Sequence, residues 1–156
     1  TVASRGRAAA ALSVVAEVGD ERACAAAVAC TKNQKSSVRK TGIDVLVTIS
    51  QKGAESAIKA IGACLEDDVD EVRDAAVQAL AKVAPKGDKH AIAAAAARLK
   101  SKFSDVRQSA VKALAGVAEP GNEEAIDALS ACLKESNVDV KREVVATLKA
   151  LGAEVA

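Results

Sequence analysis

The sequence predicts an all-α protein built as an α-solenoid of about 4.5 helical-pair repeats of 34 residues. Three observations predict this fold. First, a valine followed by a basic residue recurs every 34 residues, at Val38, Val72, Val106 and Val140. Second, a glycine keeps the same interval, at Gly19, Gly53, Gly87 and Gly121. Third, the apolar residues between these marks recur at helical spacing. A fixed interval of this size is typical of stacked arrays, in which neighbouring repeats complete a core that one helical pair cannot bury alone.

Each unit is predicted to be one helix, a glycine turn and a second helix. Unit 102–135 illustrates this, with apolar residues from Val106 to Val117 in its first helix and from Ile126 to Leu133 in its second. The units run over residues 1–33, 34–67, 68–101 and 102–135, and a half unit over 136–156 adds one more helix. The chain is therefore expected to be a single domain of nine helices, five that carry the basic position and four partners.

Short polar residues mark the expected helix starts. One set shares the repeat position just before the Val-Arg pair, where a side-chain oxygen can accept from the free amides of the first turn: Ser36, Asp70 and Ser104. A second set follows the turn glycines and can cap the second helix: Asp20, Asp88 and Asn122. The glycines are predicted to end the first helices because glycine adopts the left-handed conformation at no steric cost.

Composition and charge exclude several classes of protein. The 156 residues include one aromatic residue, Phe103, and no Met, so the core is expected to be built from Ala, Val, Leu and Ile. The net charge is +1 with both signs mixed along the chain, which does not favour a polyanion as partner. No apolar run approaches the roughly 20 residues needed to cross a bilayer, and no signal segment opens the chain. We therefore expect a soluble, cytoplasmic protein.

The four cysteines are predicted to be small core residues. Cys30, Cys64 and Cys132 share one repeat position, and Cys24 takes the position that Ile58 has in the next unit. No CxxC pair occurs, so neither a zinc site nor a disulfide framework is indicated. This usage favours a reducing compartment.

The pattern V-R-x-x-A/G-V/I-x-x-L/I occurs at Val38–Leu46, Val72–Leu80 and Val106–Leu114. With the glycine turn and second helix that follow, it resembles the HEAT-repeat family, especially its short bilin-lyase-type branch, over about the whole chain. The resemblance implies a right-handed α-solenoid (an armadillo/HEAT-like superhelix) in which the helices carrying Val-Arg line the concave face. A tetratricopeptide array has the same period, but its aromatic positions are absent here. Many HEAT repeats carry Asp six residues before the Arg, whereas this chain has Asn33, Asp67, Ser101 and Glu135 there.

The basic residues after each valine are the first candidate site. They are Arg5, Arg39, Arg73, Arg107 and Lys141. We interpret them as a structural ladder that bridges neighbouring repeats through helix ends and acidic turn residues such as Asp67 or Glu135. The alternative is a row of phosphate contacts, for which binding would fall steeply with salt.

Partner-reading residues, meaning those that bind and select a partner, are expected at the variable, solvent-facing positions of the Val-Arg helices. The repeat does not dictate which residue stands at these positions. The candidates are Lys40, Asp44, Asp74, Gln78, Lys82, Gln108, Lys112 and Arg142. They predict a mixed, polar concave surface for a protein partner of unknown identity. The alternative for each residue is a merely solvated position, since the surface lacks the aromatic anchors that dominate many interfaces.

No catalytic, cofactor-binding or metal-binding residue is predicted. His90 is the only histidine and stands at the start of a helix, where a surface role explains it. The chain has no Gly-rich phosphate loop, no GxSxG turn and no HExxH pair. We therefore expect a non-enzymatic scaffold. Two alternatives stay open, a bilin-lyase-like or other enzyme-associated HEAT subunit and a weak nucleic-acid-binding module, and the solenoid ends are candidates for self-association.

Overall fold

The computed structural model describes residue 7 and residues 17–156, and within them the chain forms eight α-helices and one 3₁₀-helix. The helices are α2 (Glu21–Cys30), α3 (Ser36–Ile49), α4 (Glu55–Ala63), η1 (Cys64–Glu66), α5 (Asp70–Val83), α6 (Lys89–Arg98), α7 (Ser104–Val117), α8 (Glu123–Ser130) and α9 (Val138–Ala150). The first helix expected from the sequence, with Arg5, lies outside the described residues. The count of nine helices therefore stays a prediction, as does the handedness.

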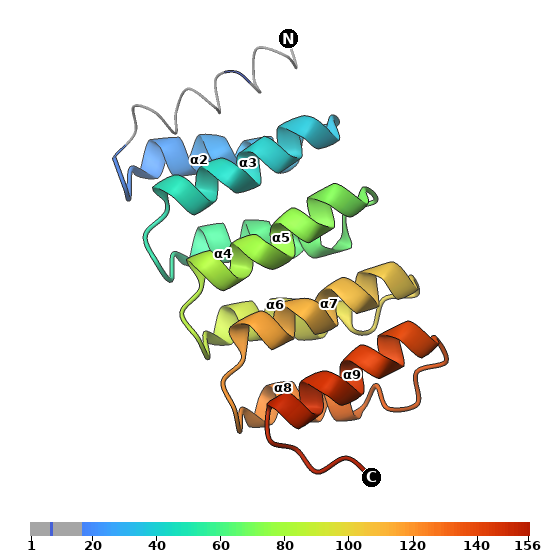
Figure 1. The fold of residues 1–156 in the computed structure, drawn as a ribbon. Helices are drawn as coiled ribbons and strands as arrows, with labels where there is room; N and C mark the ends of the chain where they lie inside the picture. Colours follow the sequence, from blue (N-terminus) through green and yellow to red (C-terminus); the bar gives the residue numbers. More distant parts are fainter. Residues whose placement is uncertain (1–6, 8–16) are drawn as a thin grey trace.

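The helices form two layers that run along one stack (Figure 1). One layer contains α3, α5, α7 and α9, and each of these helices contacts the next. The other layer contains α2, α4, α6 and α8, which also contact one another in order. The layers meet where α2 packs on α3, α4 on α5, α6 on α7 and α8 on α9. The described residues contain no strand, so the predicted all-α repeat fold is confirmed.

The core between the layers consists of aliphatic side chains, as the composition predicted. Ile43, Leu46, Leu80 and Leu114 are completely buried, and each contributes roughly 1.5–3 kcal/mol by leaving water. Small residues let the layers approach closely. A Cβ added at Gly42 of α3 would lie 2.9 Å from the backbone oxygen of Ala27 in α2, so only glycine fits this crossing.

The glycine turns bind each repeat to the next one. Their residues have φ between +79° and +88°, the left-handed region that glycine enters freely. Each turn amide donates to a carbonyl at the end of a helix in the next repeat, Gly19 to Ile49, Gly53 to Val83, Gly87 to Val117 and Gly121 to Leu151, at 2.7–2.8 Å. A helix end leaves such carbonyls without an internal donor. The turn glycines therefore satisfy the C-terminal ends of α3, α5, α7 and α9.

Part of the capping prediction is wrong. Ser36, Asp70 and Ser104 are the first residues of α3, α5 and α7, and the N-cap residues before them make no side-chain capping bond. The turn closes further upstream, because Asn33, Asp67 and Ser101 each accept from the backbone N–H two residues ahead. This contact places the helix start at Ser36, Asp70 and Ser104. The caps predicted for the other layer, Asp20, Asp88 and Asn122, are confirmed at α2, α6 and α8.

Candidate functional site

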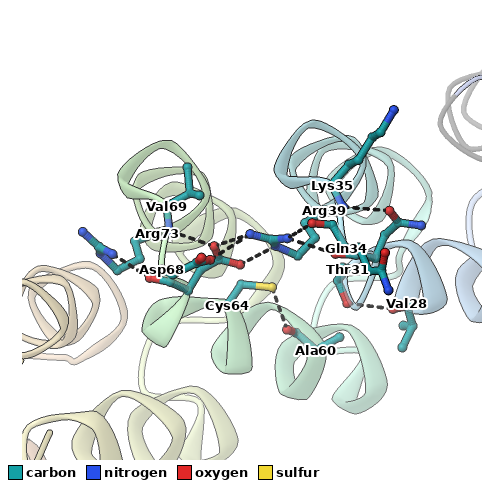
Figure 2. Close-up of polar contacts among 12 residues, drawn as sticks. Val28, Thr31, Gln34, Lys35, Arg39, Ala60, Cys64, Asp68, Val69 and Arg73 are labelled. Atoms are coloured by element: carbon teal, nitrogen blue, oxygen red, sulfur yellow. Dashed lines mark hydrogen bonds and ion pairs between the residues drawn. The ribbon is translucent and has the colours of Figure 1, made fainter. Parts of the chain in front are cut away.

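Arg39 of α3 links the turn before α3 to the turn at Asp67, which follows α4 and η1. Its Nε and Nη2 donate to the two carboxylate oxygens of Asp67 at 2.7 and 2.8 Å, and its Nη1 donates to the backbone oxygen of Asn33 at 2.9 Å. Nη2 also lies 3.0 Å from Asp68. Figure 2 shows the guanidinium between the turn at Gln34 and the turn at Asp68. A bidentate pair of this kind is among the stronger polar contacts in proteins.

Arg107 of α7 repeats this arrangement two units later. It donates to the two oxygens of Glu135 at 2.6 and 2.8 Å and to the backbone oxygen of Ser101 at 2.9 Å. The Glu135 side chain is only 7% exposed and also accepts from the backbone N–H of Asn137 at 2.8 Å. The Glu135 carboxylate thus closes its own turn through the Asn137 amide and contacts the preceding repeat through Arg107.

Arg73 of α5 differs because the position 28 residues ahead is Ser101, which has no carboxylate. Arg73 is 6% exposed, and it donates to the backbone oxygen of Asp67 and to the carboxylate of Asp70 in its own helix. Asp105 lies 3.9 Å away. Arg73 therefore has no bidentate contact to the turn at Ser101, and among the described residues only the longer ion pair with Asp105 reaches the next repeat. At the C-terminal end of the series, Lys141 is exposed and forms no ion pair within the described part of the chain.

The ladder contacts shift the acidity of their members. Burial alone raises the pKa of Asp67, but hydrogen bonds from Arg39 and from the Val69 amide outweigh it and lower that pKa. The contact with Arg107, helped by the Asn137 amide, lowers the pKa of Glu135 to about 2. The two carboxylates are therefore ionised at neutral pH and form ion pairs with their arginines.

A groove lies between α3 and α5 on the face of the layer that carries the Val-Arg helices. Its volume is about 330 Å³, and it is lined by Lys40, Asp44, Val47, Glu71, Asp74, Ala75, Gln78, Ala79 and Lys82. Five of the partner-reading candidates, Lys40, Asp44, Asp74, Gln78 and Lys82, therefore share one depression, and all five are exposed. The sequence analysis left out Glu71, which stands three residues before Asp74. Helical spacing puts these two on the same face, and this signal was available in the sequence.

The other three candidates do not line this groove. Gln108 of α7 donates to Glu143 of α9 at 2.9 Å, and the Lys112 Nζ lies 3.8 Å from the same carboxylate. Arg142 lies 3.5 Å from Asp139 in its own helix. These residues stand at the equivalent repeat positions, but their side chains contact α9 or belong to it.

The remaining titratable candidates sit apart from the groove. His90 is half-buried at the start of α6, with Nε2 3.7 Å from a carboxylate oxygen of Glu55. Cys64 is buried, and burial raises the pKa of its thiol to about 11. Among residue 7 and residues 17–156, no group of three His, Cys, Asp or Glu side chains is arranged to hold a metal ion. No helix in that same part of the chain is both long and apolar enough to cross a bilayer.

The family follows from comparison with known sequences. The model of HEAT repeats matches residues 3–81 and 84–156. The chain therefore belongs to the HEAT-repeat family, as its Val-Arg pattern predicted. Comparison with curated protein sequences gave no match.

Solved structures of the same fold are repeat solenoids. An engineered protein matches with a TM-score of 0.59 at 22% identity, over 97% of this chain and 76% of the other. A designed armadillo repeat protein in complex with the peptide (KR)4 matches with a TM-score of 0.54 at 21% identity, over 83% of this chain. Armadillo repeat proteins designed for modular peptide recognition match with a TM-score of 0.52 at 21% identity, over 82% of this chain. This chain spans 64% of the length of each designed armadillo structure. At these identities the likeness shows the fold alone.

Proposed function

We propose that this chain is a single right-handed solenoid domain that acts as a non-enzymatic scaffold and binds a protein partner on its concave surface. We take that surface to be the face of α3, α5, α7 and α9. The partner-reading residues would be Lys40, Asp44, Asp74, Gln78, Lys82, Gln108, Lys112 and Arg142. The observation that carries the proposal is the groove of about 330 Å³ between α3 and α5, because five of these residues line it.

The rigidity of the repeat supports this role. The groove residues project from α3 and α5, whose C-terminal ends are held by the glycine turns and whose preceding turns are joined by Arg39. Binding to such a surface does not have to order the scaffold first, which lowers the entropic cost of association. The designed armadillo structures of the same fold include one that holds a peptide. A cytoplasmic location stays a prediction from the sequence.

The test is site-specific photo-cross-linking in a native extract. A photoreactive amino acid replaces Gln78, which lines the groove, and in a matched control it replaces Lys59, an exposed residue of α4 in the other layer. We expect a protein cross-linked from position 78 and not from position 59. Equal products from both positions, or none from position 78, would contradict binding on this face.

Three other products would redirect the assignment. A bound pigment would favour the lyase-like alternative, and a nucleic acid lost at high salt would favour the nucleic-acid alternative. A second copy of the chain would favour self-association.

A further inference from the structure

The groove between α3 and α5 carries charges of opposite sign near its two ends. Glu71 and Asp74 lie toward the start of α5, and Lys82 lies near its end. None of these three side chains forms an ion pair with another residue of the described chain. In contrast, the other two charged residues of the groove are within reach of each other, with Lys40 Nζ 3.5 Å from Asp44. The groove charges that have no ion-pair partner among the described residues are thus two carboxylates at one end and one ammonium at the other.

The distance between these charges matches a short extended peptide. Asp74 and Lys82 are eight residues apart in α5, which corresponds to about 12 Å at 1.5 Å per residue. An extended chain advances about 3.3 Å per residue, so it covers this distance in three to four residues. A peptide that lies along the groove can therefore present one side chain to each charged end.

The floor between the charged ends is small and apolar. Ala75 and Ala79 of α5 and Val47 of α3 line it. Ala75 and Val47 are half-buried, so they offer apolar surface that a ligand can cover. Apolar side chains of a bound ligand can therefore cover this floor.

From this arrangement we propose that the groove between α3 and α5 binds an extended peptide segment of the partner that carries a basic and an acidic side chain four residues apart, with apolar residues between them. Side chains at this spacing point to the same face of an extended chain. The basic side chain pairs with Glu71 and Asp74, and the acidic one pairs with Lys82. The proposal rests on the proposed scaffold function and names the chemistry of the partner at that same surface.

Two synthetic peptides of equal composition test the spacing. One is Gly-Arg-Ala-Val-Ala-Glu-Gly, with its charges four residues apart, and the other is Gly-Ala-Arg-Glu-Val-Ala-Gly, with its charges adjacent; both are blocked at their ends. Each is titrated into the full chain labelled with nitrogen-15, and affinity is read from backbone amide resonances. We expect the first peptide to bind about threefold to tenfold more tightly, because only it reaches both ends, with a preference that falls as salt rises. Equal affinities, or no binding of the first peptide, would overturn the proposal.

Charge variants assign each end of the groove. Glu71→Gln with Asp74→Asn should remove the contribution of the peptide arginine, so that replacing that arginine by glutamine then causes no further loss. Lys82→Gln should do the same for the peptide glutamate. All three residues are exposed, and melting curves check that the variants stay folded. If the loss of affinity caused by a protein variant simply adds to the loss caused by neutralising the matching peptide charge, the pairing is wrong.

A blocked groove separates this inference from the scaffold function. Ala75→Gln places a long neutral side chain on the groove floor. If this variant loses the cross-linked partner from position 78 while the two peptides never differ in affinity, the scaffold function stands and the peptide chemistry is wrong. If position 78 cross-links no partner, the scaffold function itself fails.

Discussion

From the contact between Arg107 and Glu135 we predict how the free energy of unfolding depends on pH. Replacing Glu135 by Gln keeps the shape of the side chain but removes the charge that accepts two bonds from Arg107, at 2.6 and 2.8 Å. The contact lowers the pKa of Glu135 from 4.5 to about 2. At 1.36 kcal/mol for each pH unit, this depression is linked to about 3 kcal/mol of folding free energy as an upper bound.

The pH window follows from the direction of this change. Because the folded pKa lies below the unfolded one, the contribution is complete above pH 4.5 and is lost as the pH falls toward 2. At pH 3 about two fifths of it remains. We therefore expect Glu135→Gln to lower the free energy of unfolding by about 2–3 kcal/mol at pH 7. The difference from the native chain should shrink steadily between pH 5 and pH 3.

Urea denaturation followed by circular dichroism at pH 7, 5, 4 and 3 measures the loss of unfolding free energy at pH 7 and its decrease at lower pH. Glu154→Gln is the matched control, because Glu154 is exposed and forms no ion pair within the described part of the chain. It should change stability by less than about 0.5 kcal/mol at every pH. A Glu135→Gln effect that is absent at pH 7, or that stays constant down to pH 3, would refute the reasoning.

Three further predictions concern the ladder and the glycine turns. Ser101→Asp should raise the free energy of unfolding, and with it the urea midpoint, by about 0.5–1.5 kcal/mol, because it gives Arg73 a carboxylate at the position that Arg39 and Arg107 use. The gain should vanish in an Arg73→Ala background. A gain that persists there would refute the contact. Arg73→Ala alone should lower the melting temperature through a loss of about 1–3 kcal/mol, with partner affinity little changed; lost binding at unchanged stability would reverse that assignment. Gly87→Ala should destabilise the fold by about 1–2 kcal/mol, because the φ of Gly87 is +79°. Gly116→Ala inside α7 should stabilise it by about 0.5–1 kcal/mol, because a Cβ there meets only an ordinary contact. Thermal melts in which both variants change stability in the same direction would contradict this account.

Much of the fold was predictable because its determinants repeat along the chain. The 34-residue interval and the helical spacing of apolar residues predicted the helices and the aliphatic core, since both depend on which face each residue presents. The capping error shows the limit of local signals. Ser36, Asp70 and Ser104 are suitable N-cap residues in isolation, but the side chains of Asn33, Asp67 and Ser101 close the turn upstream of them. Two local capping signals compete there, and their relative strength is not visible in the residue types.

The candidate site was predictable only as a set of positions. The repeat register identified positions of the Val-Arg helices outside the core. All eight candidates lie on those helices, seven of them exposed and Gln108 half-buried. The register did not indicate that Lys40 and Asp74 would share a groove while Gln108 and Lys112 contact Glu143 instead. Equivalent positions differ in this way because a side chain of one repeat meets whatever residue its neighbouring repeat presents.

The sequence by itself determined that this protein is an all-helical HEAT repeat array, because periodic hydrophobicity and turn glycines act within each unit and need no knowledge of distant contacts. The tertiary structure decided which charges are paired. Arg39 and Arg107 each pair with a carboxylate 28 residues ahead, whereas Arg73 contacts Asp70 in its own helix. Lys82, at the end of a groove, forms no ion pair with another described residue. The physical reason is that ion pairing depends on distances of a few ångströms between neighbouring repeats, and these distances exist only after the repeats have stacked.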